Sequence, residues 1–134
     1  MIALTVAEIA KAISGQIKGD QAVVVTGSVE TDSRLVKTGS LFVAKPGEET
    51  DGHFFASAAK QAGAVALIVE RWLDEVDLPQ ILVQDSVLAL GELAAFVLAA
   101  IRLKTNLQVI GITGSNGKTT TKNMLRAILS QVGE

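Results

Sequence analysis

Cysteine is absent from this sequence, which excludes disulfides, thiolate zinc sites and thiol nucleophiles and fits a reducing compartment. The only histidine is His53, so a paired-histidine metal site cannot form. Lysine and arginine do not form runs, and the formal net charge is -2 with a pI near 5.4. These absences argue against a nucleic acid or an anionic membrane as the main partner, and we expect a cytoplasmic protein.

Signals for secretion or membrane insertion are also lacking. Residues 1–13 carry Glu8 and lack the basic start and long apolar core of a signal peptide, so we interpret them as folded structure. The longest apolar stretch, residues 86–103, is interrupted by Gly91 and Glu92 and is shorter than the roughly 20 residues of a membrane span. We therefore expect a buried helix there and no membrane insertion. With 49% hydrophobic and 19% charged residues, the chain has the composition of a soluble globular protein.

Helix and strand signals alternate along the chain. Thr5 followed by Glu8 has the spacing of a capping box, and Gly15 can end that first helix in a left-handed conformation. Runs of β-branched and aromatic residues predict strands at 22–27 and 40–44. Further elements are expected in this order: a helix at 54–63 ended by Gly63, a strand buried on both faces at 64–69, a strand at 81–84, a helix capped by Asp85 or Ser86 and running to Leu103, a strand at 108–113, and a helix from about Lys118. This alternation predicts an α/β fold.

A glycine-rich turn, GITGSNGKTTT at 111–121, joins the last predicted strand to the last predicted helix. One glycine of the strict phosphate-loop pattern is missing. Gly114 and Gly117 still allow the backbone N–H groups to converge on an anion at the helix N-terminus, where Lys118 adds positive charge. Thr119 can offer its hydroxyl to Mg²⁺. The alternative is a plain turn with a solvent-facing lysine, but the residue types and their context favour a site for nucleotide phosphates.

The same turn resembles the ATP-binding loop of the Mur ligases, a family that also places a non-glycine residue where Ile112 stands. Residues 31–55, TDSRLVKTGSLFVAKPGEETDGHFF, resemble the UDP-binding N-terminal domain of members that act late in peptidoglycan synthesis. Two activities share that segment: addition of the third peptide residue, and addition of D-alanyl-D-alanine to UDP-N-acetylmuramoyl-tripeptide. Ser115, the run TTTKNM at 119–124 and residues 1–15 favour the second activity.

The resemblance implies an ATP-dependent amide-bond ligase with ATP and Mg²⁺ as cofactors and with UDP-N-acetylmuramoyl-tripeptide and D-alanyl-D-alanine as partners. ATP would phosphorylate the terminal carboxylate, and the dipeptide amine would attack the acyl phosphate. Lys118 would be catalytic, because it neutralises charge on the transferring phosphoryl group, and Thr119 would hold the metal. The implied ATP-binding residues are Thr113, Gly114, Ser115, Asn116, Gly117, Lys118, Thr119 and Thr120.

Mur ligases are three-domain proteins several times longer than this chain, so we expect a fragment. Residues 1–84 would form a small mixed-sheet domain that binds the UDP precursor. Residues 85–134 would form the first helix, strand, phosphate loop and helix of a truncated ATP-binding domain. We expect this fragment alone to be inactive, because the remaining Mg²⁺ ligands, the modified lysine of the central domain and the C-terminal domain fall outside it.

The resemblance also implies a site for the UDP end of the substrate, because a diphosphate needs donors and uracil needs a polar cleft. Ser33, Arg34 and Lys45 would supply donors, and tight turns at Pro46–Gly47 and Asp51–Gly52 would expose backbone N–H groups. The full predicted set is Thr31, Asp32, Ser33, Arg34, Lys45, Gly47, Asp51, Gly52 and His53.

Less specific roles remain open for two members of this set, and for the chain as a whole. Arg34 could instead form an ion pair with Asp32 or be a surface charge. For His53 a helix cap near Phe54 is favoured over a substrate contact. Residues 70–80 are interpreted as a solvated connection with Trp72 and Leu73 packed inward. A stand-alone nucleotide-sugar-binding module and an early-truncated phosphate-loop kinase or NTPase are the other functions considered.

Overall fold

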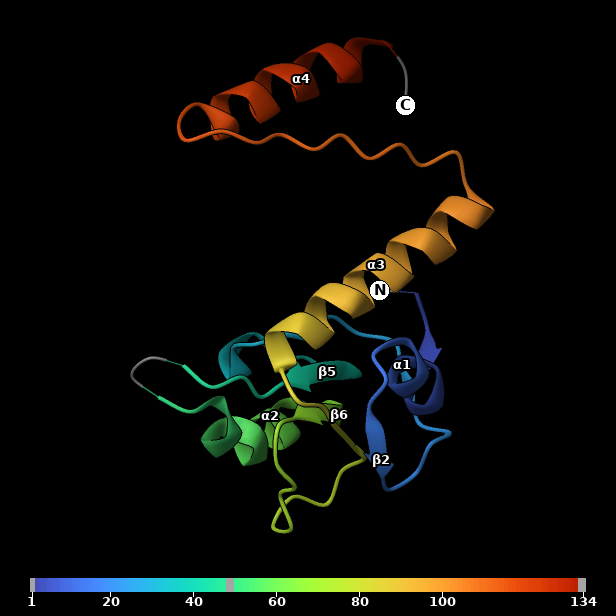
Figure 1. Cartoon of the computed structure of the whole chain (residues 1–134), viewed down its shortest axis with the longest axis vertical. Helices are drawn as coiled ribbons and strands as arrows, with labels where there is room; N and C mark the ends of the chain where they lie inside the picture. The colour runs from blue at the N-terminus through green and yellow to red at the C-terminus, as the bar shows by residue number, and fades with distance from the viewer. Residues whose placement is uncertain (1, 48–49, 133–134) are drawn as a thin grey trace.

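A five-stranded mixed sheet forms the centre of the part of the chain before residue 85 (Figure 1). The computed structural model describes residues 2–47 and 50–132. In spatial order the strands are β2 (Gln16–Lys18), β7 (Gln80–Leu82), β6 (Ala64–Val69), β5 (Ser40–Val43) and β4 (Val29–Glu30). The four strands from β7 to β4 are parallel to their neighbours, and β2 adds an antiparallel edge. The prediction of a small mixed-sheet α/β domain is confirmed.

Helices and short turns connect and cover these strands. The helices are α1 (Val6–Ala12), α2 (Ala56–Ala62), α3 (Ser86–Lys104) and α4 (Lys118–Val132). Two 3-10 turns, η1 (Ser33–Leu35) and η2 (Gly52–Phe55), follow β4 and β5, and a two-residue ladder pairs β1 (Leu4–Thr5) with β3 (Val24–Val25). The predicted helix at 54–63 is thus η2 continued by α2.

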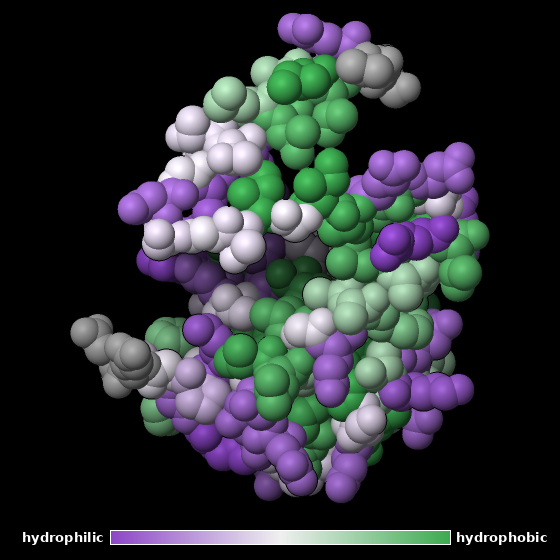
Figure 2. Space-filling view, turned by 45° about the horizontal axis from the view of Figure 1, so that its top comes forward, coloured by the Kyte–Doolittle hydropathy of each residue, from purple (hydrophilic) through white to green (hydrophobic). Residues whose placement is uncertain are grey.

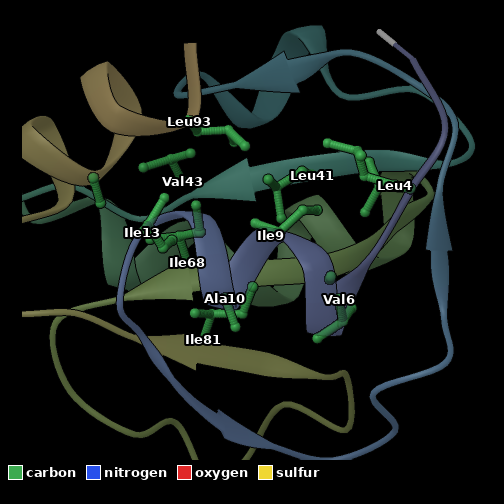
Figure 3. Packing of buried hydrophobic residues seen from close by; sticks show 13 residues of the cluster. Leu4, Val6, Ile9, Ala10, Ile13, Leu41, Val43, Ile68, Ile81 and Leu93 are labelled. Atoms are coloured by element: carbon green, nitrogen blue, oxygen red, sulfur yellow. The ribbon is translucent and has the colours of Figure 1, made fainter. Parts of the chain in front are cut away.

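Strands β5 and β6 are buried on both faces, as the apolar run at 64–69 predicts. Successive side chains point to opposite sides of a strand, so Leu41 and Val43 face α1 while Phe42 faces α2. Figure 3 shows Leu41, Val43 and Ile68 meeting residues of α1 on the first face. Two hydrophobic cores result, one on each side of the sheet.

The start of α1 follows the sequence prediction, but its end does not. The Glu8 carboxylate accepts the Thr5 backbone N–H at 2.8 Å, and the Glu8 N–H donates to the Thr5 hydroxyl at 3.2 Å, so the capping box is confirmed. The left-handed residue is Ser14, with φ 51°, and the prediction of Gly15 in that role is wrong. Gly15 is needed for space instead, because a Cβ there would lie 2.4 Å from Ile81 Cγ2.

Other boundaries differ where strands are short. The expected strand at 22–27 is reduced to Val24–Val25, and the expected strand at 81–84 is observed at 80–82. Strands β2 and β4 were not predicted. They have only three and two residues, each includes a charged side chain, and neither contains an apolar run that would indicate a strand. Gly63 ends α2 as predicted, and it does so in a left-handed conformation with φ 108°.

The side-chain amide of Gln80 holds the connection between β6 and β7 through hydrogen bonds to its backbone. The buried Gln80 side chain accepts the Leu73 N–H at 2.9 Å and donates to the carbonyls of Leu73 and Val76. Leu73 is buried as expected, whereas Trp72 is 36% exposed, so its predicted inward packing is wrong. The Lys18 ammonium covers the Trp72 ring at 5.9 Å and pairs with Asp74 at 2.5 Å.

Helix α3 begins as predicted but is not the buried helix expected at 86–103. Asp85 caps it by accepting the N–H groups of Val87 and Leu88, yet only Ser86, Ala89 and Leu93 are buried. Its first turns pack on the domain, and the remainder projects away from it (Figure 1). By length and composition alone α3 could cross a membrane, with 17% of its apolar window buried.

The predicted strand at 108–113 is not observed, and residues 106–114 form neither helix nor strand. A strand needs a neighbour for its N–H and C=O groups, and the described residues offer none beside this segment. Helix α4 begins at Lys118 as predicted. The space-filling view shows a broad hydrophobic area on the upper part of the molecule, formed by α3, α4 and the segment between them (Figure 2).

Glycine substitutions at two sites test the packing of Gly15. We expect Gly15→Ala to lower the free energy of unfolding by about 1–3 kcal/mol, because the new methyl group would overlap Ile81. Gly91 is the matched control: it lies in α3 with nothing within 4 Å of its Cβ position, so Gly91→Ala should be neutral or stabilise by up to about 1 kcal/mol. Urea unfolding of both variants measures the difference. Equal effects at the two sites would contradict this account.

Limited trypsin digestion tests where the folded part of the chain ends. Residues 105–117 lack helix or strand, and all of them except Ile112 are exposed, so the first cuts should follow Lys104 or Lys118. Mass spectrometry of the early products should show a resistant species containing residues 2–104. Early cleavage after Lys37 or Lys45, with the later residues left intact, would contradict the prediction.

Candidate functional site

A cavity of about 390 Å³ opens where two neighbouring parallel strands end. The carboxyl ends of parallel strands lie at one edge of a sheet, so the loops that follow them meet there. The lining residues come from the loop after β4 and the loop after β5: Thr31, Asp32, Ser33, Arg34, Lys45, Gly47, Thr50, Gly52 and Phe55. The structure therefore brings together every predicted UDP-binding residue except Asp51 and His53.

Two lining residues were missed by the sequence prediction. Thr50 lies between the two predicted turns, and Phe55 ends η2 with 43% of its surface exposed. Phe55 belongs to the GHFF run of η2, and an exposed aromatic residue beside two glycine turns was a usable signal. Its ring adds an apolar group to a lining that is otherwise mostly polar or charged.

Arg34 forms the ion pair with Asp32 that was considered as the alternative to a phosphate contact. Its Nη2 donates to Asp32 Oδ2 at 2.6 Å and its Nε donates to Oδ1 at 2.9 Å. This contact, together with the Arg34 backbone N–H, lowers the pKa of Asp32 to about 2. The Arg34 side chain is 86% exposed, so water screens the pair and little holds the guanidinium in this position.

Close backbone approaches occur at both predicted glycine turns, but the Gly52 N–H is bonded inside the loop and is not exposed as predicted. A Cβ at Gly52 would lie 2.5 Å from the Lys45 carbonyl oxygen, which accepts the Gly52 N–H at 2.9 Å. At Gly47 a Cβ would lie 2.6 Å from the Thr50 carbonyl oxygen. Glycine at these two positions lets the loop fold back on itself, and the position of Gly52 sets that of Lys45 at the cavity wall.

His53 does not cap a helix, and the interpretation favoured for it is wrong. The cap of η2 is Asp51, whose carboxylate accepts the His53 N–H at 2.9 Å. The His53 side chain is completely buried, with Nδ1 2.6 Å from Asp51 Oδ1 and Nε2 accepting the Glu70 N–H at 2.9 Å. Both ring nitrogens are thus engaged inside the protein rather than directed into the cavity.

Asp51 also binds Arg71, whose Nη1 lies 2.6 Å from Asp51 Oδ2. The His53 backbone N–H, with smaller contributions from the His53 ring and Arg71, holds the pKa of Asp51 well below its ordinary 3.8. Ionised Asp51 therefore stabilises the fold above about pH 4, and this contribution is lost as the pH falls through its lowered pKa. Sequence reasoning missed Arg71, although it follows directly on a buried strand at the edge where the loops meet.

A larger cavity of about 590 Å³ lies farther along the same edge of the sheet, between β2, β7 and α3. Its charged residues are Glu70, Asp85 and Glu92, all acidic, and none of the predicted site residues lines it. An anionic diphosphate is repelled by such walls and is attracted by Arg34 and Lys45 in the smaller cavity.

The glycine-rich turn at 111–117 has two glycines in backbone conformations that other residues rarely adopt. Gly114 and Gly117 have φ values of 148° and 75°, which side-chain-bearing residues rarely adopt, and α4 begins directly after them. The Lys118 ammonium donates to the Gly114 carbonyl and, at 3.5 Å, to that of Ser115. It therefore lies folded over the loop, and a bound phosphate would have to draw it away.

The residues of this loop fit a nucleotide phosphate better than they fit a complete metal site. Lys118 and Thr119 line a shallow cavity of about 270 Å³ with Ile110, Ile112 and Lys122. The other predicted ATP-binding residues, Thr113 to Gly117 and Thr120, are exposed. Thr119 offers one hydroxyl ligand to a metal, and the part of the chain that the structure describes holds no cluster of three acidic or histidine ligands.

Comparison with known proteins links both sites to one family. The model of the Mur ligase family, catalytic domain, matches residues 26–97, which is more than half of the chain, and that of the Mur ligase middle domain matches residues 112–134. The chain is 46% identical over 133 residues to UDP-N-acetylmuramoyl-tripeptide–D-alanyl-D-alanine ligase of Escherichia coli, covering 99% of this chain and 28% of that protein.

Solved structures agree. The crystal structure of MurF from Acinetobacter baumannii superimposes with a TM-score of 0.83 at 36% identity, covering 98% of this chain and 28% of that one. Among the relatives compared by sequence, a UDP-N-acetylmuramoyl-L-alanyl-D-glutamate–2,6-diaminopimelate ligase of Listeria monocytogenes is 44% identical, but the match covers only 70% of this chain. The chain thus spans less than a third of the length of these relatives. On the match over residues 26–97, this chain belongs to the Mur ligase family.

Proposed function

We propose that this chain is the substrate-binding N-terminal part of an ATP-dependent ligase that adds D-alanyl-D-alanine to UDP-N-acetylmuramoyl-tripeptide. The observation that carries the proposal is the cavity at the ends of β4 and β5, where Arg34 and Lys45 converge with two glycine turns. The similarity to the D-alanyl-D-alanine ligase of Escherichia coli extends over 99% of the chain. That extent favours this activity over addition of the third peptide residue.

Within this cavity the charged groups have distinct tasks. Arg34 would turn from Asp32 toward the diphosphate. Its charge-assisted hydrogen bonds to phosphate oxygens would be stronger than its exposed ion pair with Asp32. Asp32 stays ionised at neutral pH even when Arg34 turns away, because its ordinary pKa is 3.8, and its carboxylate is suited to accept a hydrogen bond from a ribose hydroxyl. Lys45 and the backbone at Gly47 would complete the phosphate contacts, and Phe55 would cover one face of the uracil.

The glycine-rich loop would hold the phosphates of ATP. When bound, Mg·ATP supplies the phosphoryl group that activates the terminal carboxylate of the precursor. Lys118 would leave the carbonyls of Gly114 and Ser115 and neutralise phosphate charge, while the Thr119 hydroxyl would bind the metal. The loop amides and the N-terminus of α4 would provide further stabilisation of the anion.

We place the boundary between the precursor-binding and ATP-binding domains at 84/85. The large exposed hydrophobic side chains of the second part support this division, because further parts of a full-length ligase would cover them: Leu88, Phe96, Leu103, Val109, Ile110, Met124 and Ile128 are all more than a third exposed. In this proposal α3 is a helix of a cytoplasmic enzyme, not a membrane span.

Substitution of Arg34 tests the precursor site. We expect Arg34→Ala to weaken binding of UDP-N-acetylmuramoyl-tripeptide by about 1.5–3 kcal/mol, because a charge-assisted contact to the diphosphate is lost. Lys37→Ala is the matched control, since this exposed lysine follows the same turn without lining the cavity. Isothermal titration calorimetry measures both. Unchanged affinity of the Arg34 variant would place the diphosphate elsewhere.

The second test concerns ATP. We expect this chain to bind Mg·ATP weakly or not at all and to release no phosphate from it. Within residues 2–47 and 50–132 no strand flanks the loop, and ordering each loop residue costs about 1–2 kcal/mol. Calorimetry with Mg·ATP and a phosphate-release assay against a protein-free blank measure this. Phosphate release above the blank that Lys118→Ala abolishes would refute the expectation.

A further inference from the structure

His53 is held in one protonation form by its two partners. The Glu70 backbone N–H can only donate, so the His53 Nε2 that receives it at 2.9 Å must be the unprotonated acceptor. Nδ1 then carries the proton and donates to the Asp51 carboxylate at 2.6 Å. A completely buried, neutral imidazole with both nitrogens satisfied is a specific arrangement, and filling space alone does not require it.

The same arrangement fastens the cavity loop to the neighbouring strand. Within the loop, Asp51 caps η2 and contacts the His53 ring. Outside it, the His53 ring reaches Glu70 and the Asp51 carboxylate reaches Arg71, the two residues directly after β6. These two links join residues 17 to 20 positions apart in the chain, so they hold η2 against the end of β6.

The position of η2 is passed on to the cavity by direct contact. Gly52, between the two linked residues, lies against the Lys45 backbone so closely that a Cβ would be 2.5 Å from its carbonyl oxygen. Phe55, at the end of η2, lines the cavity together with Lys45 and Gly52. A shift of η2 therefore moves three parts of the cavity wall at once.

We propose that His53 is a positioning residue for nucleotide binding: through its Nε2 bond to Glu70, supported by the Asp51–Arg71 pair, it fixes the loop that forms one wall of the precursor cavity. This inference rests on the proposed function, because it assigns to that cavity the UDP end of the precursor. His53 itself does not touch the ligand. Its effect on affinity comes from sparing the loop the entropy of becoming ordered on binding.

Two nearly isosteric variants separate the two bonds of the ring. In His53→Gln the amide oxygen can take the place of Nε2 and keep the bond from Glu70. In His53→Asn the shorter side chain can keep the contact with Asp51 but leaves the Glu70 N–H without its acceptor. We expect calorimetry with UDP-N-acetylmuramoyl-tripeptide to give His53→Gln an affinity within about twofold of the parent. His53→Asn should bind about tenfold more weakly, which corresponds to about 1.4 kcal/mol.

A destabilised control excludes a merely structural role. Ile81→Val removes one methyl group from the core on the α1 face, away from the cavity, and should lower the unfolding temperature without changing precursor affinity. Arg71→Met tests the second link from its half-exposed end and should weaken binding about threefold. It also gives the answer where His53→Asn does not fold, since unchanged affinity in Arg71→Met then overturns the proposal.

The outcomes distinguish this inference from the proposed function. If the parent chain binds the precursor and Arg34→Ala weakens it, equal affinities of His53→Gln and His53→Asn overturn the positioning role alone. If the parent chain does not bind the precursor, the proposed function fails and the inference fails with it. Weak binding by His53→Asn, rescue by His53→Gln and unchanged binding by Ile81→Val support it.

Discussion

The parallel pairing of β4, β5, β6 and β7 is the constraint from which the other features follow. Because four neighbouring strands point the same way, the loop after β4, the loop after β5, Glu70–Arg71 and the start of α3 all emerge at one edge of the sheet. An antiparallel arrangement would send alternate loops to the opposite edge. The cavity, the His53 links and the attachment of α3 are consequences of this single choice of direction.

That pairing depends in turn on burial. Parallel sheets need cover on both faces, and here α1 covers one face while α2 and the 70–80 connection cover the other. The edge strand β2 is antiparallel and only three residues long, and its Ile17 packs against the core on the α1 face. Gly15 and Gln80 serve this cover: the first lets the chain pass close to Ile81, and the second ties together the connection over α2's side of the sheet.

Features that depend on residues close together in the sequence could be predicted. Features that depend on contacts between distant residues could not. The Thr5–Glu8 box, the left-handed Gly63 and the Asp85 cap each depend on residues within four positions, and each is observed. Most of the cavity was also predicted, because residues 31–55 resemble the UDP-binding domain of the Mur ligases. Arg71 and the buried role of His53 could not be read in the same way, since their partners lie 17 to 20 residues away. The wrong predictions of a strand at 108–113 and of a buried α3 have the same cause. An apolar pattern indicates that a segment needs packing partners, but it does not show whether the chain provides them.

The bond between Glu70 and Ser86 has a mechanical consequence. The Glu70 carboxylate accepts both the N–H and the hydroxyl of Ser86, at 2.8 and 2.7 Å, so the first turn of α3 is tied to the residue that also meets His53. Bending between the two proposed domains is therefore resisted at 84–86 and is easier at Thr105, where α3 ends. The 19 residues of α3 span about 28 Å, and the helix then acts as a rigid lever. A tilt of about 10° at its base would carry its far end, at Lys104, through about 5 Å.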